Sequence, residues 1–187
     1  MENKRYSHGE ELSNTLSHGA GILLGITAGY FLLEKALTNP HPHWAAGCVL
    51  VYLAGMLASY ISSTWYHGSR PGSRKELLRK FDHGAIYLHI AGTYTPFTLL
   101  VLRHAGGWGW GIFAFVWLSA IVGFILAFKK LKEHSNLETV CFVGMGSAIL
   151  VALNTLMDCL SAIGASPAFW WLIGGGASYI LGAAFHS

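Results

Sequence analysis

Residues 108–128 read WGWGIFAFVWLSAIVGFILAF and contain no charged side chain. A helix needs about 20 mostly apolar residues to cross the hydrocarbon core of a bilayer, and this stretch is long enough. Similar apolar blocks lie on both sides of it in the chain. The sequence therefore predicts an all-α fold, a polytopic membrane helical bundle that forms a single transmembrane domain over residues 1–187. Six transmembrane helices are expected, near residues 14–33, 44–66, 82–102, 108–128, 139–157 and 168–186.

The composition of the whole chain agrees with a membrane protein. Of its 187 residues, 53% are hydrophobic and only 11% are charged. A soluble domain normally carries roughly a quarter charged residues, so too little charge is present to cover a water-facing surface. The net charge of +3 is small, and the basic residues cluster between apolar blocks, which does not favour nucleic-acid binding. We expect membrane lipids as partners and no nucleic acid; the sequence does not indicate an oligomeric state.

The basic residues predict the orientation in the membrane. Ten of the twelve fall on one side if the chain weaves regularly, and the other side receives only Lys35 and Arg103. By the positive-inside rule the N-terminus is cytoplasmic, and with six spans the C-terminus is cytoplasmic as well. The ten residues are Lys4, Arg5, Arg70, Arg74, Lys75, Arg79, Lys80, Lys129, Lys130 and Lys132.

The first predicted span carries a repeated small residue on one face. Gly21, Gly25 and Gly29 form two overlapping GxxxG spacings. Small residues at this spacing let two helix backbones approach closely. The pattern predicts close packing against another helix, and a dimer face is the alternative.

Polar residues at the start of the same span also share a face. Glu11, Asn14 and His18 are separated by three and four residues, which places them on one side of a helix. Ionisable groups within spans are costly and usually face the bundle interior, so they are candidates for a functional site. The alternative is an N-terminal polar cap with interhelical hydrogen bonds.

Ser63 and His67 share a face at the end of the second predicted span, because they are four residues apart. A histidine can bind a metal through one ring nitrogen, and a serine one turn away could hold a bound water or the substrate. A histidine close to the lipid headgroups can also be a plain interfacial residue. Both interpretations of His67 remain open.

The third predicted span begins with Asp82 and His83, directly after a basic loop. Asp82 could pair with a lysine or arginine of that loop, or lie favourably at a helix N-terminus. Pro96 should kink or open this helix, and the hydroxyls of Thr93 and Thr95 can bond to carbonyls that it frees. Together with the first two spans, this helix predicts one polar, histidine-rich centre near the cytoplasmic boundary. Its members are Glu11, His18, Ser63, His67, Asp82 and His83.

Several motifs of this chain resemble those of the bacterial hemolysin III family. They are Glu11-Leu-Ser-Asn14-Thr-Leu-Ser17-His18-Gly-Ala-Gly21, Ser63-Thr-Trp-Tyr66-His67, Asp82-His83-Gly-Ala-Ile-Tyr87 and Ala91-Gly-Thr93-Tyr-Thr95-Pro96-Phe97. The resemblance covers nearly the whole chain. This family belongs with the progestin and adipoQ receptors, in a wider group that includes alkaline ceramidases.

The resemblance implies a seven-helix protein of the bacterial inner (plasma) membrane, with a Zn²⁺ ion near the cytoplasmic face. It makes His67 a metal ligand and places Ser63 and Asp82 beside the zinc-bound water, with Asp82 as a general base or water-orienting group. The implied function is membrane lipid homeostasis through a zinc-dependent hydrolase-like site that cleaves an amide or ester of a lipid such as a ceramide.

The chain departs from the family pattern at its end. We expect this chain to lack the last family helix, with its paired histidines, because the sequence stops at Phe185-His186-Ser187. A catalytic zinc usually has three protein ligands, so we expect the metal site of this chain to be incomplete. Two other functions therefore stay open: a non-catalytic receptor-like or membrane-fluidity protein, and a pore-forming cytolysin. The polar residues gather at one end, which does not favour the pore.

Overall fold

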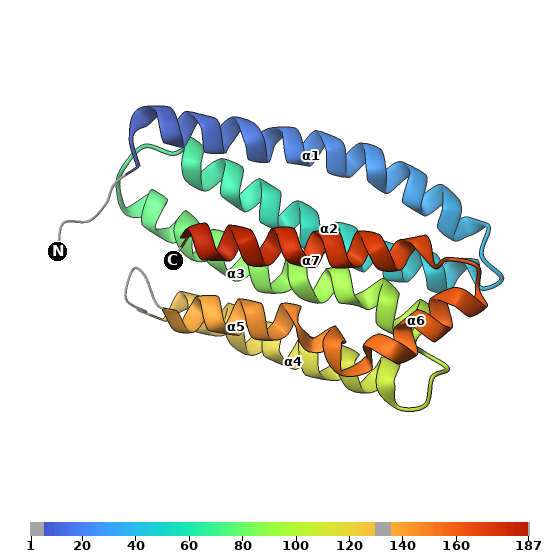
Figure 1. Cartoon of the computed structure of the whole chain (residues 1–187). Helices are drawn as coiled ribbons and strands as arrows, with labels where there is room; N and C mark the ends of the chain where they lie inside the picture. Colours follow the sequence, from blue (N-terminus) through green and yellow to red (C-terminus); the bar gives the residue numbers. More distant parts are fainter. Residues whose placement is uncertain (1–5, 130–135, 187) are drawn as a thin grey trace.

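The computed structural model describes residues 6–129 and 136–186, and every regular element in these two ranges is helical. The predicted all-α fold class is confirmed. In Figure 1 the long helices lie side by side, and α1 begins at the same end of the bundle at which α7 ends. The elements in chain order are α1 His8–Leu37, α2 Pro42–Gly68, α3 Ser73–Pro96, the π-helix η1 Phe97–Val101, α4 Trp108–Phe128, α5 Asn136–Gly146, the 3₁₀ helix η2 Ala148–Ala152, α6 Leu153–Ala162 and α7 Pro167–His186.

Four stretches of the described chain are long and apolar enough to cross a membrane: α1, α2, α4 and Val140–Ala162. The predicted segment 82–102 covers the later part of α3, η1 and Leu102. The helix α3 begins before this segment, at Ser73, and its first turns carry the charged residues that the apolar segment leaves out. Pro96 is its last residue. The predicted segment 168–186 corresponds to α7. Four basic residues used for the orientation, Lys4, Arg5, Lys130 and Lys132, lie outside the described residues.

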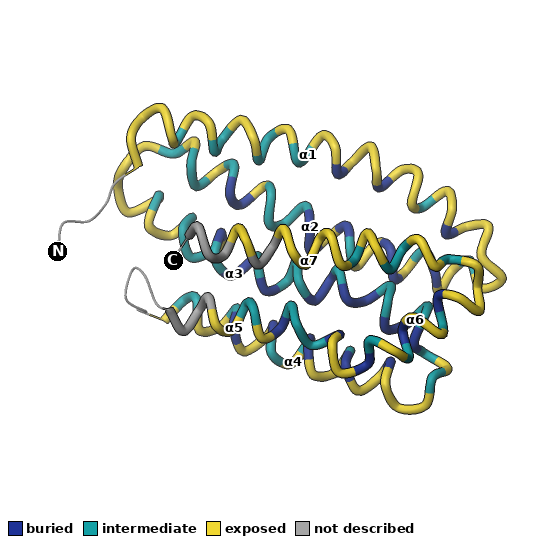
Figure 2. Tube along the Cα trace, viewed as in Figure 1, coloured by how far each residue is buried: buried dark blue, intermediate teal, exposed yellow. Residues whose placement is uncertain are grey.

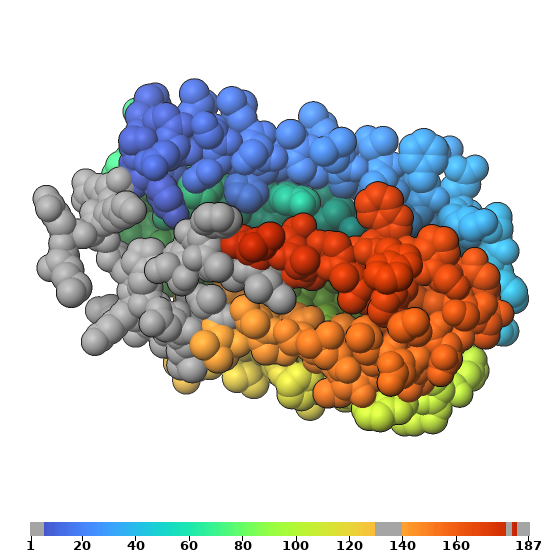
Figure 3. Space-filling model, in the orientation of Figure 1, coloured from blue at the N-terminus to red at the C-terminus, as the bar shows by residue number. Residues whose placement is uncertain are grey.

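Large apolar side chains cover much of the outer surface. Leu24 on α1 is 71% exposed and Trp171 on α7 is 83% exposed. Figure 2 shows the outward faces of α1 and α7 as mostly exposed, and Figure 3 shows α7 lying across one face of the molecule. A water-facing surface rarely carries so much apolar area, whereas lipid tails accept it without penalty. The exposed surface is therefore that of a protein surrounded by lipid.

The GxxxG face of α1 packs against α2. A Cβ atom added to Gly21 would lie 2.9 Å from the ring of Tyr60, and one added to Gly25 would lie 2.5 Å from Cε of Met56. A Cβ atom added to Gly29 would lie 3.0 Å from the side chain of Leu53. The absence of side chains at these positions is what lets the two helices approach. The prediction of close packing is confirmed, and α2 of the same chain covers this face.

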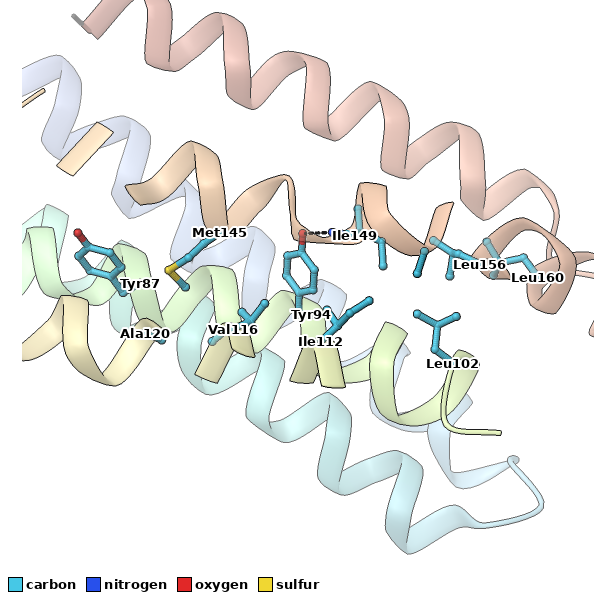
Figure 4. Close-up of a cluster of buried hydrophobic side chains, with 12 residues drawn as sticks. Tyr87, Tyr94, Leu102, Ile112, Val116, Ala120, Met145, Ile149, Leu156 and Leu160 are labelled. Atoms are coloured by element: carbon cyan, nitrogen blue, oxygen red, sulfur yellow. Dashed lines mark hydrogen bonds between the residues drawn. The ribbon is translucent and has the colours of Figure 1, made fainter. Parts of the chain in front are cut away.

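The largest buried core lies between α3, α4 and the α5–α6 segment. Figure 4 shows its side chains in a row along the helices, from Tyr87 at one end past Val116 to Leu156 near the other, and Val116 and Leu156 are completely buried. This core holds α3 in place from one side while α2 packs against its other side. The helix that carries Asp82 is therefore fixed by neighbours on both sides.

Pro96 opens the end of α3, as the sequence predicts. The chain continues as the π-helix η1, in which the amide of Leu102 donates to the carbonyl of Phe97 at 3.0 Å. The hydroxyls of Thr95 and Thr98 donate to carbonyls one turn earlier. These bonds satisfy backbone groups that have no access to water within the bundle.

A second helix is interrupted at the same level. The hydroxyl of Tyr94 donates to the carbonyl of Gly146 at 2.6 Å and accepts from the amide of Ile149 at 3.1 Å. Gly146 ends α5 and Ile149 lies in η2, so the tyrosine bridges the break between them (Figure 4). The apolar stretch Val140–Ala162 is thus a broken helix, joined by a side chain from α3.

Candidate functional site

Three helices place charged side chains together at one end of the bundle. Nδ1 of His67, in the last turn of α2, lies 2.7 Å from Oε2 of Glu11, near the start of α1. The other oxygen, Oε1, accepts a hydrogen bond from Nζ of Lys75 on α3 at 2.5 Å. The side chains of His67, Lys75 and Glu11 are only 8%, 15% and 18% exposed. Glu11 therefore links α1 to both other helices through one carboxylate.

Local sequence explains how these residues reach their positions. Ser7 and Glu10 form a capping box that starts α1, so Glu11 is released from the capping role and points to its neighbours. The loop from α2 to α3 turns at Gly72, whose φ of +149° is a conformation that favours glycine. This turn brings Lys75, in the first turn of α3, back towards the end of α2, where Nζ also donates to the carbonyl of Ser69. Ser7 and Glu10 cap α1, whereas Glu11 makes interhelical hydrogen bonds, which the alternative interpretation also included.

Aromatic rings surround His67. The ring of His18 lies nearly parallel to it, with 5.9 Å between the centroids and 8° between the planes. Tyr66 and Tyr6 pack against it as well, with centroids 4.6 Å and 5.6 Å away. Partial burial and the nearby carboxylates of Glu11 and Asp82 raise the pKa of the Tyr6 phenol. His67 is thus held between rings as well as by Glu11.

Ser63 and Asp82 form a buried pair beside this group. The hydroxyl of Ser63 donates to Oδ1 of Asp82, and the two residues are 8% and 9% exposed. Ser63 lies one helical turn before His67 on α2, as the sequence predicts, and Asp82 lies on α3. A buried carboxylate needs such a donor, because an unbonded one would be costly to desolvate. We call Glu11, Ser63, His67, Lys75 and Asp82 the polar centre.

The remaining predicted residues have different positions. His18 joins the polar centre through its ring contact with His67. Asn14 is half-buried on α1, and its backbone carbonyl accepts from Ser17. His83 is half-buried on α3. Because consecutive helical residues point about 100° apart, its side chain extends from a different face of α3 than that of Asp82.

Sequence reasoning missed Lys75 and Tyr6 as members of this region. Lys75 was counted only as a basic loop residue, and it lies 64 residues from Glu11 in the chain. Tyr6 precedes the first predicted span, and no spacing pattern includes it. The short loop between α2 and α3 was a signal for Lys75, because a short loop brings the residues that follow it close to the end of α2.

The described residues fit a zinc ion only in part. A carboxylate bound to one ring nitrogen orients a metal-binding histidine so that the other nitrogen can reach the metal, and Glu11 holds Nδ1 of His67 in this way. A catalytic zinc usually needs three protein ligands. In residues 6–129 and 136–186, no group of three His, Cys, Asp or Glu side chains is arranged to hold a metal ion. One oriented imidazole is present without a complete ligand set.

The bundle and its polar centre define a helical integral membrane protein with buried ionisable groups at one end. A family model described as haemolysin-III related matches residues 6–187, and the chain belongs to this family. Hemolysin-3 of Bacillus cereus is 37% identical over 179 residues, which cover 94% of this chain and 77% of the relative. The hemolysin-3 homolog of Bacillus subtilis (strain 168) is 35% identical over 177 residues, covering 95% and 80%. The family resemblance predicted from the motifs is confirmed.

Proposed function

We propose that this chain acts in membrane lipid homeostasis, with the polar centre as a hydrolase-like site for a lipid amide or ester. The observation that supports this proposal is the convergence of Ser63, His67 and Asp82 at one end of a lipid-exposed bundle. Ionisable groups inside membrane helices are costly and usually mark function. Asp82 can accept a proton from a hydroxyl at the position of its bond to Ser63, and the Glu11 carboxylate fixes the ring of His67.

The proposal includes six membrane crossings with both termini on the cytoplasmic side of a bacterial inner membrane. Four stretches meet the criteria for a span, and α3 with η1 and α7 would be the other two. A membrane-impermeant maleimide tests the orientation on cells, with single cysteines at the exposed positions Ser73 and His104 and the native cysteines replaced by alanine. The proposed orientation predicts that the cysteine at 104 is labelled in intact cells and that the cysteine at 73 is labelled only after the cells are opened. Labelling of intact cells at 73 and not at 104 overturns it.

We also propose that His67 binds a zinc ion. Its support is the Glu11–His67 contact together with family membership. Zinc content of the purified full chain, measured by mass spectrometry, should be close to one per chain and should be lost in His67→Ala. His104→Ala, at the other end of the bundle, is the matched control. Absence of zinc in the unmodified chain removes the metal from the proposal.

Hydrolysis is tested with the full chain in vesicles that contain a ceramide or an ester lipid. Removal of a general base typically lowers a rate by 10²–10⁴-fold, so Asp82→Asn should lower hydrolysis by at least about 100-fold. Asp158→Asn changes an exposed carboxylate on α6 and should leave the rate unchanged. An active chain with equal rates in both variants would exclude Asp82 from the chemistry.

A non-catalytic receptor-like or membrane-fluidity role is the second candidate. It is favoured by the satisfied contacts of Glu11 with His67 and Lys75, which suit a structural cluster, and by the incomplete metal ligand set. This role predicts that an effect of the protein on membrane fluidity persists in His67→Ala. Cytolysis rests only on the names of the relatives. Dye release from vesicles by the pure chain would support it.

A further inference from the structure

An apolar groove opens on the flank of the bundle, at the end opposite to the polar centre. Its volume is about 360 Å³, and its walls come from the first turns of α2, from the end of α3 with η1, and from α4. On α2 the lining residues recur at helical spacing and form one continuous face; they are His43, Trp44, Gly47, Cys48 and Val51. Ligand sites of similar size are commonly concave and mostly apolar.

The two tryptophans of the groove are fixed in orientation. Nε1 of Trp44 donates to the carbonyl of Leu99 at 3.1 Å, and Nε1 of Trp117 donates to the hydroxyl of Thr95 at 3.1 Å. Because both indole N–H groups are bonded, the rings present carbon to the groove. A Cβ atom added to Gly47 would meet no atom within 4 Å, so protein does not fill this space. The groove is an open apolar hollow with two fixed indole rings on its walls.

A positively charged side chain packs against Trp44, one of the residues that line the groove. Cζ of Arg103, which follows η1 closely in the chain, lies 5.4 Å from the centre of the Trp44 ring. Arg103 is half-buried, and it forms no ion pair with a carboxylate of the described residues. A guanidinium group at a membrane surface binds phosphate oxygens in a two-point geometry. The apolar groove therefore has a cationic side chain beside one of its lining residues, and this side chain suits a phosphate group.

We propose that this groove binds one phospholipid, with an acyl chain along Trp44 and Gly47 and the phosphate at Arg103. The occupant follows from charge complementarity at Arg103 and from the lipid that surrounds α2 and α4 if they span the membrane. The site is independent of the polar centre and of any activity there. With the topology proposed above, the groove lies in the membrane leaflet farther from the polar centre.

The test uses the full chain in vesicles that contain phosphatidylglycerol with a photoreactive acyl chain. Peptides that contain residues 44–51 or 113–117 should carry the label. Gly47→Leu fills the groove and should remove most of it, whereas Gly111→Leu is the matched control, since a Cβ at Gly111 also meets no atom within 4 Å but Gly111 does not line the groove. Equal labelling in the two variants overturns the proposal.

Arg103→Gln gives a second test that does not depend on filling the groove. A basic side chain near a membrane surface contributes to anionic lipid binding by roughly fivefold, so labelling by phosphatidylglycerol should fall about fivefold. Labelling by photoreactive diacylglycerol, which has no phosphate, should not change. Lys35→Gln is the control for loss of charge at the same end of the bundle. Uniform labelling of all lipid-facing peptides, whichever lipid is used, indicates ordinary bilayer contact and overturns the proposal.

Discussion

Glu11 and His67 lie 56 residues apart in the chain, and their side chains meet at 2.7 Å between Oε2 and Nδ1. The contact joins the beginning of α1 to the end of α2, and the same carboxylate binds Lys75 on α3. One side chain thus holds three helix ends together.

Glu11→Ala should therefore destabilise the bundle at this end. The change leaves the partly buried His67 and Lys75 without their acceptor, which should lower the free energy of unfolding by about 2 kcal/mol. Thermal unfolding in detergent measures the effect. Glu34→Ala removes an exposed carboxylate from the same helix and should stay within about 0.5 kcal/mol of the unmodified chain. Similar losses in both variants would contradict a linking role for Glu11.

Ser63 and Ser62 provide a matched pair, since both are 8% exposed on α2. Ser63→Ala leaves the buried Asp82 carboxylate without this donor and should cost about 1–3 kcal/mol. Ser62 donates only to the carbonyl of Ser59 in its own helix, so Ser62→Ala should cost less than about 0.5 kcal/mol. Unfolding by denaturant compares the two. A larger loss for Ser62→Ala would show that the pair with Asp82 adds no stability.

Three glycines of the bundle should respond differently to alanine. At Gly55 the added Cβ would lie 2.5 Å from the backbone oxygen of Leu88, so α2 and α3 must separate, at a cost of about 1–3 kcal/mol. At Gly25 the atom in the way is the flexible end of Met56, and the cost should be smaller. Gly47→Ala meets open space and should stabilise the helix by about 0.5–1 kcal/mol. Melting temperatures give the order, and a Gly55→Ala variant as stable as Gly47→Ala would contradict the packing.

Tyr94→Phe should loosen the break between α5 and η2. It removes the acceptor of the Ile149 amide and the donor to the Gly146 carbonyl, a loss of about 2 kcal/mol. Hydrogen exchange should become faster at the amide of Ile149. Tyr30→Phe, an exposed site on α1, should leave this exchange unchanged. Unchanged protection of Ile149 in Tyr94→Phe would mean that the tyrosine does not hold the junction.

Helical spacing was enough to place Glu11 with His18 on one face, and Ser63 with His67 on another, because the pitch of a helix is fixed. It could not bring Lys75 to Glu11, because that contact depends on a turn at Gly72 and on the packing of three helices. The chemistry of Pro96 predicted the opening of α3.

The interruption of the fifth apolar block has a weaker signal in the sequence, the pair Gly146-Ser147. No proline lies between Val140 and Ala162, and the block was predicted as one continuous span over residues 139–157. The break forms where a tyrosine from another helix supplies the missing backbone partners. The break lies at Gly146 and Ser147, small residues at which helices often kink, and the tertiary contact with Tyr94 completes it.

The Tyr94 bridge has a consequence for the order of events during synthesis. Tyr94 leaves the ribosome 52 residues before Gly146, an interval of roughly 3–10 s at usual rates of translation. The hydroxyl of Tyr94 is therefore synthesised before the two backbone groups that it finally bonds. The junction between α5 and η2 can gain these two hydrogen bonds only when α3 is already beside it. The earlier part of the chain thus supplies a partner that the later part needs to complete its own backbone hydrogen bonding.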